Sequence, residues 1–567
     1  MRGLFLMKNT GNRQNAVFEI GLIYLYTFAA ELLLSSVLFA FHLTVQGWWL
    51  IVSFFLGSLS AYIISGRKHP SDFIKALSAA LITAVLLTLI ANLVADQSYD
   101  GNAYHKLAVG LLKNGWNPVY EDPAVLESEL NISGLSRYNL WITSYCKFPW
   151  IFAASVYSLT GKLEYGKVYT LIGMLMLFCL SEPVFRKKFT RNQSILLALA
   201  ISVNPVAAAQ CDTFYVDGFL QIIFFVLALS LLWFDINPDQ EDDHLILSVI
   251  WSAMLICSAV KFTGLLYGGI FCFGNYLIYV YLHRHKNPRE LNHRLFWSYV
   301  LLAVLCVFLA GLPTYVVNLI RHGNPVYPLL GGGVDIMTPL SPFSSGNRAE
   351  HLFLSIFSQL DHFSSKSGQM VHLKVPFTFH YDEIRFLKYS DVKLSGFGPF
   401  FSGALLLSAG ISALSMKACR KTSLGTAAMA NMALCLLLTF AIEESWWARY
   451  APYLYFLVFL GLILGLSQKR AIKAAADAGL AALLLSSIAF GAYLPRQAQF
   501  THSIKNEIAS IRDSGKRIIL DDTGASPASV CFDLMDYGVP FSLSDDPDLP
   551  YVQEENFEIG YVIEENQ

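Results

Sequence analysis

A short acidic segment, Asp96-Gln97-Ser98-Tyr99-Asp100, holds the residue types best suited to chemistry, and Tyr104 and His105 follow it closely. If one helix runs through this segment, a spacing of four places Asp96 and Asp100 on one face, with Tyr104 next along it. Carboxylates at the edge of an apolar stretch can deprotonate an acceptor hydroxyl or hold a divalent cation against a phosphate. The alternative is that these polar residues simply end a membrane helix.

Three other charged residues stand at the edges of apolar stretches. Asp217 begins one such stretch, Lys261 separates two, and Arg449 lies among aromatic residues in Trp446-Trp447-Ala448-Arg449-Tyr450. Charges at membrane depth are candidates for function. The alternatives are a helix cap for Asp217 and a lysine that reaches the interface for Lys261.

A fourth candidate region is Asn318 to Pro328, which holds Arg321, Asn324 and Tyr327 before a proline-rich turn. Arg321 is expected at the same membrane depth as Lys261 and Arg449. Cations gathered at one depth suit the phosphate of a lipid-linked substrate.

The elements that must position these residues are membrane helices. The 567 residues are 54% hydrophobic and 14% charged, against about 25% charged in an average soluble domain. A net charge of -2 without a basic block excludes nucleic acid as a partner. The nine cysteines form no C-x-x-C pair and are interpreted as apolar packing residues.

Apolar runs of about 20 residues predict about thirteen transmembrane helices. The predicted spans are 17–42, 48–66, 73–95, 166–185, 194–210, 218–234, 244–260, 262–282, 295–319, 396–416, 424–442, 450–466 and 472–493. The pair 244–282 is one long apolar stretch that Lys261 interrupts.

The orientation follows from lysine and arginine in the short loops, which favour the cytoplasmic side. Basic clusters alternate along the chain so that the N-terminus is expected in the cytoplasm and the C-terminus outside. Three large segments, 96–165, 320–395 and 494–567, are then expected outside. The apolar part of the first, Leu140 to Leu159, is predicted to be an interfacial or re-entrant helix, because counting it as a span would invert every later loop.

These features predict an all-α polytopic membrane protein with a small C-terminal α/β extension. Residues 1–72 are expected to form an N-terminal hairpin, 73–493 the transmembrane core, and 494–567 the extension. Within the extension, Arg517 to Leu520 predicts a strand, and a turn from Asp521 to Pro527 leads into a helix.

From about residue 75 to 460 the chain resembles the GT-C-fold glycosyltransferases, a superfamily that includes protein O-mannosyltransferases and the lipid A aminoarabinose transferase. The segments that carry this resemblance are Asp100-Gly101-Asn102-Ala103-Tyr104-His105, Asp217-Gly218, Lys261-Phe262-Thr263-Gly264, Gly323-Asn324-Pro325-Val326-Tyr327-Pro328 and Trp446 to Tyr450. Here the acidic segment follows the third predicted span, so residues 17–66 are an addition to the usual pattern.

The resemblance implies a bacterial cytoplasmic-membrane enzyme that moves a sugar from a polyprenyl-phosphate donor to a glycan, lipid or protein acceptor outside. Asp100 would act as general base with Asp96 in support, and Lys261 and Arg449 would neutralise the leaving phosphate. The remaining candidates would bind substrate: Tyr104, His105, Asp217, Arg321, Asn324 and Tyr327. No cofactor is certain, and a divalent cation is a possibility. The alternatives are an O-antigen polymerase or ligase and a transporter or lipid flippase.

Overall fold

The computed structural model describes residues 12–68, 70–236, 243–284, 289–330, 343, 346–362, 371–523, 527–551 and 560–564. The first eleven residues, expected on the cytoplasmic side, lie outside this described part. Among the described residues, ten helical stretches are long and apolar enough to cross a membrane, and three shorter apolar helices accompany them. The prediction of an all-α polytopic membrane protein is therefore confirmed.

The long helices are α1 (Asn12–Ala40), α2 (Gly47–Ile64), α3 (Pro70–Ala91), α8 (Tyr169–Arg186), α11 (Asp217–Ile236), α13 (Phe262–His283), α14 (Arg289–Leu305), α17 (Phe401–Cys419), α18 (Ser423–Ala441) and α20 (Arg470–Gly491). The shorter apolar helices are α7 (Phe148–Thr160), α12 (Asp243–Val260) and α19 (Pro452–Leu466). The remaining helices are α4 (Lys106–Lys113), α5 (Pro123–Glu129), α6 (Leu135–Ser144), α9 (Arg191–Ser202), α10 (Pro205–Gln210), α15 (Val317–His322), α16 (Arg348–Phe357), α21 (Leu494–Ser514) and α22 (Ala528–Tyr537).

One predicted span needs correction. The stretch 194–210 is two helices, α9 and α10, because Asn204 caps the second helix through the amide of Ala207 and Pro205 begins it. The stretch 295–319 continues from α14 through two π-helical turns into α15. By contrast, Lys261 does separate two helices, since its backbone is extended between α12 and α13.

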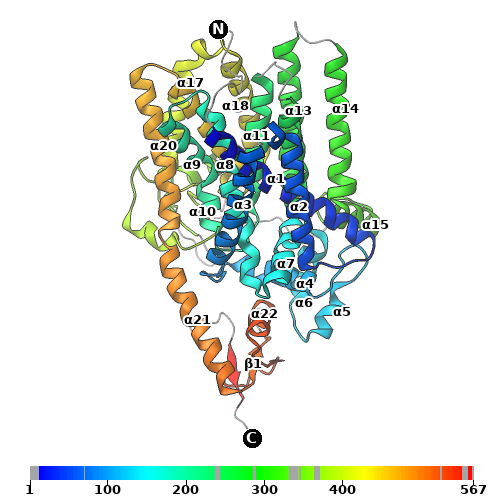
Figure 1. Cartoon of the computed structure of the whole chain (residues 1–567). Coiled ribbons are helices and arrows are strands. Elements are labelled where there is room, and N and C mark those ends of the chain that lie inside the picture. Colours follow the sequence, from blue (N-terminus) through cyan, green and yellow to red (C-terminus); the bar gives the residue numbers. More distant parts are fainter. Residues whose placement is uncertain are drawn as a thin grey trace.

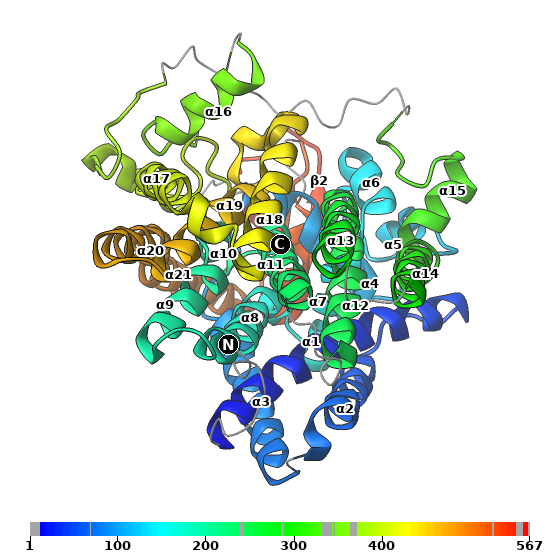
Figure 2. The same ribbon diagram turned by 90° about the horizontal axis from the view of Figure 1, so that it is seen from above.

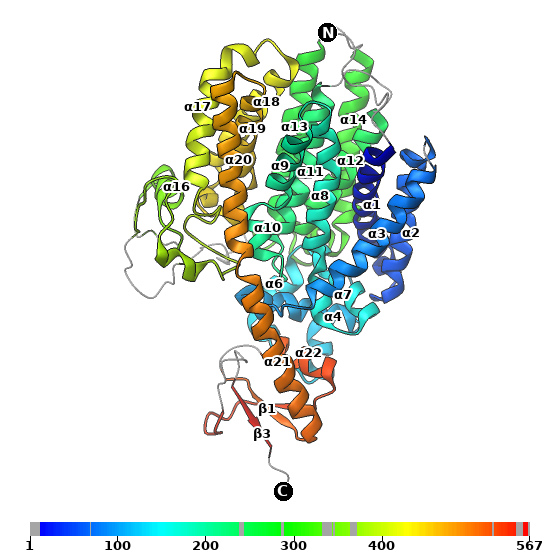
Figure 3. The ribbon, with the colours of Figure 1, turned by 60° about the vertical axis from the view of Figure 1, so that its left-hand side comes forward.

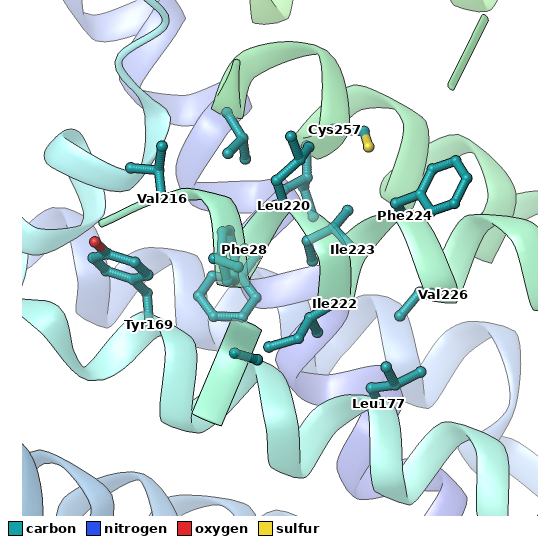
Figure 4. Close-up of a cluster of buried hydrophobic side chains, with 14 of the residues drawn as sticks. Phe28, Tyr169, Leu177, Val216, Leu220, Ile222, Ile223, Phe224, Val226 and Cys257 are labelled. Carbon is teal, nitrogen blue, oxygen red and sulfur yellow. The ribbon is translucent and has the colours of Figure 1, made fainter. Parts of the chain in front are cut away.

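The core of the bundle surrounds α11, which lies near the centre when the molecule is viewed from above (Figure 2). Leu220, Ile223 and Phe224 of this helix are buried against side chains of neighbouring helices, including Phe28 of α1 and Cys257 of α12 (Figure 4). All nine cysteines are buried and free. Their interpretation as packing residues is confirmed.

The segment between α3 and α8 contains no helix long enough to span a membrane. Its longest apolar helix, α7, has 13 residues and is buried among α2, α4 and neighbouring segments. Leu140 to Leu159 is therefore not a span, as expected. This segment and the loop that carries residues 371–395 lie at the same end of the bundle.

The C-terminal extension projects from that end (Figure 1). Helix α20 runs on into α21 as one helical stretch of 45 residues, Arg470–Ser514, which leaves the bundle and reaches a three-stranded sheet (Figure 3). The strands are β1 (Ile518–Asp521), β2 (Phe541–Ser544) and β3 (Tyr561–Ile563), in the order β2-β1-β3, with β1 parallel to β2 and antiparallel to β3. The predicted strand and the helix after it, α22, are confirmed.

The loop before α17 is held by a buried ion pair. Lys374 and Glu383 contact each other with both side chains fully buried. Glu383 also accepts hydrogen bonds from the backbone amides of Leu360 and His380, each at 2.7 Å. A buried carboxylate with this many donors fixes the loop shape, because removing it would leave a cation and two amides unpaired.

Candidate active site

Three carboxylates meet one guanidinium at the end of the bundle from which the extension projects. Arg449 Nη2 lies 3.1 Å from Asp100 Oδ2, its Nε lies 3.1 Å from Asp217 Oδ2, and its Nη1 lies 3.1 Å from Asp391 Oδ2. Lys261 adds a second cation, with its Nζ 2.6 Å from Asp217 Oδ1. We call these five residues the Arg449 cluster.

Four of the five members of the Arg449 cluster stand where a helix begins, ends or breaks, and Asp391 lies in the loop before α17. Asp100 immediately precedes the π-helical turn Gly101–His105, and Asp217 is the first residue of α11, where the positive end of the helix dipole favours a carboxylate. Lys261 fills the extended break between α12 and α13, and Arg449 lies in a short 3₁₀ turn between α18 and α19. Membrane helices end where polar side chains begin, so these charges gather at one depth.

Aromatic rings enclose the two cations. The guanidinium of Arg449 lies 4.9 Å from the ring centroid of Tyr215 and 5.1 Å from those of Trp447 and Tyr450. Lys261 Nζ lies 4.1 Å from the Tyr450 centroid. These cation–π contacts and the ion pairs hold the cations in place and shield them from water.

The cluster forms part of the wall of a cavity of about 910 Å³, near the upper end of the usual range of about 300–1,000 Å³ for ligand sites. Asp100 and Asp391 line this cavity, with side chains 20% and 15% exposed, whereas Asp217 is only 1% exposed and lies behind them. Aromatic and basic side chains complete the wall: Tyr99, Tyr138, Tyr389, Phe500, Lys388, Lys393 and Arg496. The cavity therefore presents carboxylates, cations and aromatic rings to one ligand.

Burial and charge determine the protonation states around the cluster. Burial opposes the charge of Arg449, but the carboxylates of Asp217 and Asp391 outweigh it and raise the pKa of the guanidinium well above its usual value. Burial raises the pKa of Asp391, Arg449 opposes that rise, and Asp100 adds to it. The pKa of Asp391 therefore lies above that of an exposed aspartate.

His105 and Tyr104 lie behind Asp100, outside the residues that line the cavity. His105 is buried, and its Nδ1 accepts a hydrogen bond of 2.7 Å from the indole of Trp150. Burial lowers the pKa of His105 to about 4, although Asp100 and Asp217 oppose this shift, so its ring is neutral near pH 7. These two residues lie in the turn that follows Asp100 and outside the cavity lining, and their role in substrate binding stays a prediction.

The expectation that one helix carries Asp96 and Asp100 on one face is wrong, because residues 95–98 are not helical and the helix that holds Asp100 begins at Tyr99. Asp96 Oδ1 accepts from the amide of Ser98 and Oδ2 from that of Phe214, both at 2.7 Å. Its neighbours are Lys106 and Glu164. Asp96 lines the cavity but shapes the loop there and takes no part in the Arg449 cluster.

Arg321, Asn324 and Tyr327 do not join the cluster or line the cavity. The guanidinium of Arg321 lies 3.4 Å from the carbonyl of Val119. The amide of Asn324 donates to the carbonyl of Leu329 at 2.6 Å, and the ring of Tyr327 stacks on His322. These residues shape the turn after α15 and are not brought together with Arg449, and their role in substrate binding stays a prediction.

The carboxylates of the cluster do not suit a divalent cation. Asp100, Asp217 and Asp391 each direct an oxygen at Arg449, and a metal ion would have to displace that guanidinium. Among the described residues, no group of three or more His, Cys, Asp or Glu side chains is placed to hold a metal ion. The reaction proposed below therefore uses no divalent metal ion.

Asp391 and the cavity cations Lys388, Lys393 and Arg496 were missed by sequence reasoning. They lie in polar segments outside the spans, where charged residues are common and none stands out. Only one signal pointed to Asp391: it lies shortly before the apolar stretch of α17, as Asp217 precedes that of α11. The fold that brings this loop to Arg449 was needed to find it.

Comparisons with known proteins give a fold similarity alone. No protein family matches the chain, and no curated protein does. Among solved structures, the chain is similar to ArnT from Cupriavidus metallidurans in the apo state, with 12% identity, a TM-score of 0.46, and coverage of 83% of this chain and 87% of that one. At this identity no site residue is transferred from that protein to this chain.

Proposed function

We propose that this protein is a membrane glycosyltransferase that moves a sugar from a polyprenyl-phosphate-linked donor to an acceptor hydroxyl outside the cytoplasmic membrane. The observation that carries the proposal is the pair of accessible carboxylates, Asp100 and Asp391, which Arg449 holds side by side on the wall of a large polar and aromatic cavity. Carboxylates bind sugar hydroxyls, and aromatic rings cover the apolar faces of sugars.

Asp100 is the proposed general base. Its Oδ2 is engaged by Arg449, which orients the group and leaves Oδ1 for the proton of the acceptor hydroxyl. The acceptor oxygen attacks the anomeric carbon, and the bond from that carbon to the phosphate oxygen breaks with its electron pair leaving on the phosphate. The products are the inverted glycoside and the polyprenyl phosphate.

The donor phosphate is assigned to the cations that line the cavity. Lys388, Lys393 and Arg496 each lie against an aromatic ring, and none of the three forms an ion pair with a described carboxylate. Lys261 and Arg449, in contrast, are engaged by carboxylates. We therefore assign Lys261 and Arg449 to positioning, and the cavity cations to the charge that develops on the leaving phosphate.

The lipid tail of the donor has a route along α3. Leu86, Leu89, Ile90 and Leu93 are all about half exposed along this helix and its end, as expected for a face in contact with lipid. Asn92 and Ala95, at the same end of α3, line the cavity. An isoprenoid chain lying on this face would bring its phosphate to the cavity.

The transporter alternative predicts charges in the middle of the membrane, often at broken helices. The Arg449 cluster instead lies at helix ends beside a cavity that α21 and α22 also line. For the polymerase or ligase alternative, His362 lines the cavity, whereas Arg321 and Arg385 do not. Neither alternative accounts for the three carboxylates around Arg449.

The test uses the full chain in lipid nanodiscs with a panel of polyprenyl-phosphate sugars, each radiolabelled in the sugar, and a mixture of envelope glycan and lipid acceptors. Release of free polyprenyl phosphate with transfer of label to an acceptor is the expected result for at least one donor. Binding of lipid without cleavage of any donor, together with its movement between leaflets, would support the flippase instead. A strict need for a diphosphate-linked oligosaccharide would support the polymerase or ligase.

A further inference from the structure

The C-terminal extension touches the turn that carries Asp100. Helix α22 packs against α4, the Gly101–His105 turn and the 3₁₀ segment before α8. Lys106 begins α4, six residues after Asp100, and its Nζ lies 2.6 Å from Glu164 Oε1 and 3.5 Å from Asp533 Oδ2 of α22. The extension therefore supplies one of the two carboxylates that pair with Lys106, the residue directly after the Gly101–His105 turn.

Lys106 is buried, with its side chain 2% exposed. Burial opposes its charge, but the carboxylates of Asp533 and Glu164 outweigh this effect and raise the pKa of the ammonium. A buried cation needs such partners, since an unpaired one is strongly destabilising. Lys106 Nζ also lies 3.5 Å from the carbonyl of Asp96, which places the ion pair at the base of the loop from Asp96 to Asp100.

Further contacts fix α22 in the same place. Asp536 Oδ2 accepts a hydrogen bond of 2.7 Å from the amide of Leu163, and its other oxygen accepts from the hydroxyl of Tyr157. Lys162 Nζ lies 4.1 Å from the ring centroid of Tyr537. These polar contacts set the orientation of α22 on the membrane domain, which apolar packing alone would leave less specific.

The apolar part of the contact is close. Phe532 of α22 is fully buried, and a Cβ added to Gly110 of α4 would lie 2.2 Å from its Cζ atom. Only glycine at position 110 allows this approach. On α21, Thr501 accepts a hydrogen bond of 2.8 Å from the amide of Ala95, and Lys505 donates one of 2.5 Å to the carbonyl of Asn92. The extension thus clamps both the start and the end of the segment that contains Asp100.

The extension also forms part of the cavity wall. Arg496, Gln497 and Phe500 of α21 and Asp533 and Asp536 of α22 line it together with Asp100 and Asp391. A membrane domain without α21 and α22 would therefore lack this part of the cavity wall.

We propose that the C-terminal extension helps to form the active site. In this proposal Asp533 acts through Lys106 to hold the turn that positions Asp100. Asp533 is a positioning residue: it touches no reacting atom, and removing its charge loosens residues 99–113. The expected effect of Asp533 on the transfer rate rests on the proposed function, whereas its expected effect on the turn rests on geometry alone.

The first arm measures amide hydrogen exchange of peptides that cover residues 99–113 in the full chain. Asp533→Asn is expected to speed this exchange about 10- to 100-fold, the change expected when a hydrogen bond to a charged group is lost. Asp513→Asn is the matched control, because its carboxylate is exposed on α21 and pairs with the neighbouring Arg512. Exchange in Asp533→Asn equal to that in the control would overturn the proposal.

The second arm measures steady-state transfer. Asp533→Asn is expected to lower kcat at least tenfold with little change in KM for the donor, and Asp533→Glu is expected to restore part of the rate. Unchanged kcat despite faster exchange would overturn the link to Asp100. Absence of transfer by the wild-type chain would contradict the proposed function and leave the exchange arm to test the clamp.

A third variant tests the same contact without changing a charge, in case Asp533→Asn fails to fold. Gly110→Ala places a methyl group against Phe532 and disturbs the same contact without touching a charge. It is expected to speed exchange in residues 99–113, as Asp533→Asn does. Gly269→Ala is its control, since a Cβ there meets nothing within 4 Å. If Gly110→Ala leaves exchange in this turn unchanged, the clamp proposal is wrong.

Discussion

Arg449 Nη2 donates a hydrogen bond of 3.1 Å to Asp100 Oδ2, although 349 positions separate the two residues in sequence. The same guanidinium contacts Asp217 and Asp391, so one arginine fixes three carboxylates from different parts of the chain. A planar group with five donors in a fixed geometry can do this, whereas an ammonium is a single point charge.

Replacing Arg449 by lysine is expected to reduce transfer about 100-fold or more, because one ammonium cannot orient three carboxylates and small displacements of catalytic groups cost about that much. Initial rates at saturating donor are the measurement. Arg420→Lys, at an exposed position in the loop between α17 and α18, is the control. Equal rates for Arg449→Lys and the control would contradict the positioning role of Arg449.

Replacing Asp391 by asparagine is expected to lower the rate and to raise KM for the acceptor, because this carboxylate lines the cavity beside Asp100. We expect a loss of about 10- to 100-fold, similar to the removal of one hydrogen bond to a charged group. Asp382→Asn, an exposed position in the same loop, serves for comparison. Wild-type kinetics in Asp391→Asn would remove this residue from the site.

Gly101 begins the turn after Asp100 and has no room for a side chain. An added Cβ would lie 2.1 Å from Asp96 Oδ2 and 2.3 Å from Ser98 Oγ. Gly101→Ala is therefore expected to displace Asp100 and to reduce transfer, even though alanine favours helix. Gly410→Ala, with nothing within 4 Å of the added Cβ, should keep full activity. Activity and thermal unfolding, measured together, separate displacement of the site from general loss of stability.

The docking of α22 should depend on pH. Burial raises the pKa of Asp536 from 3.8 to about 7, hydrogen bonds from Tyr157 and Leu163 oppose this rise, and Asp533 adds to it. Because the docked state then holds a proton that the undocked state releases, the stability of docking is full near pH 4 and falls as the pH rises toward 7.

Hydrogen exchange of residues 528–537, corrected for the intrinsic pH dependence of exchange, measures this effect. Protection is expected to fall between pH 5 and about pH 7.5 in the wild type and to change less in Asp536→Asn, which carries no titrating group at this position. Protection that rises with pH in the wild type would mean that the sign of the Asp536 shift is wrong.

The sequence predicted the membrane architecture well, since long apolar runs and charges at their ends follow directly from the cost of placing polar groups in lipid. It also singled out Asp100, Asp217, Lys261 and Arg449, because each interrupts or ends an apolar run. The same rule failed for Arg321, which ends a helix but contacts a backbone carbonyl elsewhere.

Asp391, Lys393 and Arg496 escaped detection for a physical reason. They lie in loop and helix segments outside the membrane spans, where charged residues are common. Their residue types therefore do not mark them as site residues until the tertiary structure places them on the cavity wall. The helical spacing assumed for Asp96 and Asp100 failed because Asp96 takes backbone amides as partners, which competes with helix formation.

The central claim is that Asp100 removes a proton from the acceptor during sugar transfer. The most direct measurement compares transfer by Asp100→Asn and wild-type protein in nanodiscs with the donor found in the panel, with Asp513→Asn as control. We expect Asp100→Asn to lose about 100- to 10,000-fold in rate, the usual contribution of a general base, while it still binds polyprenyl phosphate. Transfer by Asp100→Asn at a rate near that of the control would contradict the claim.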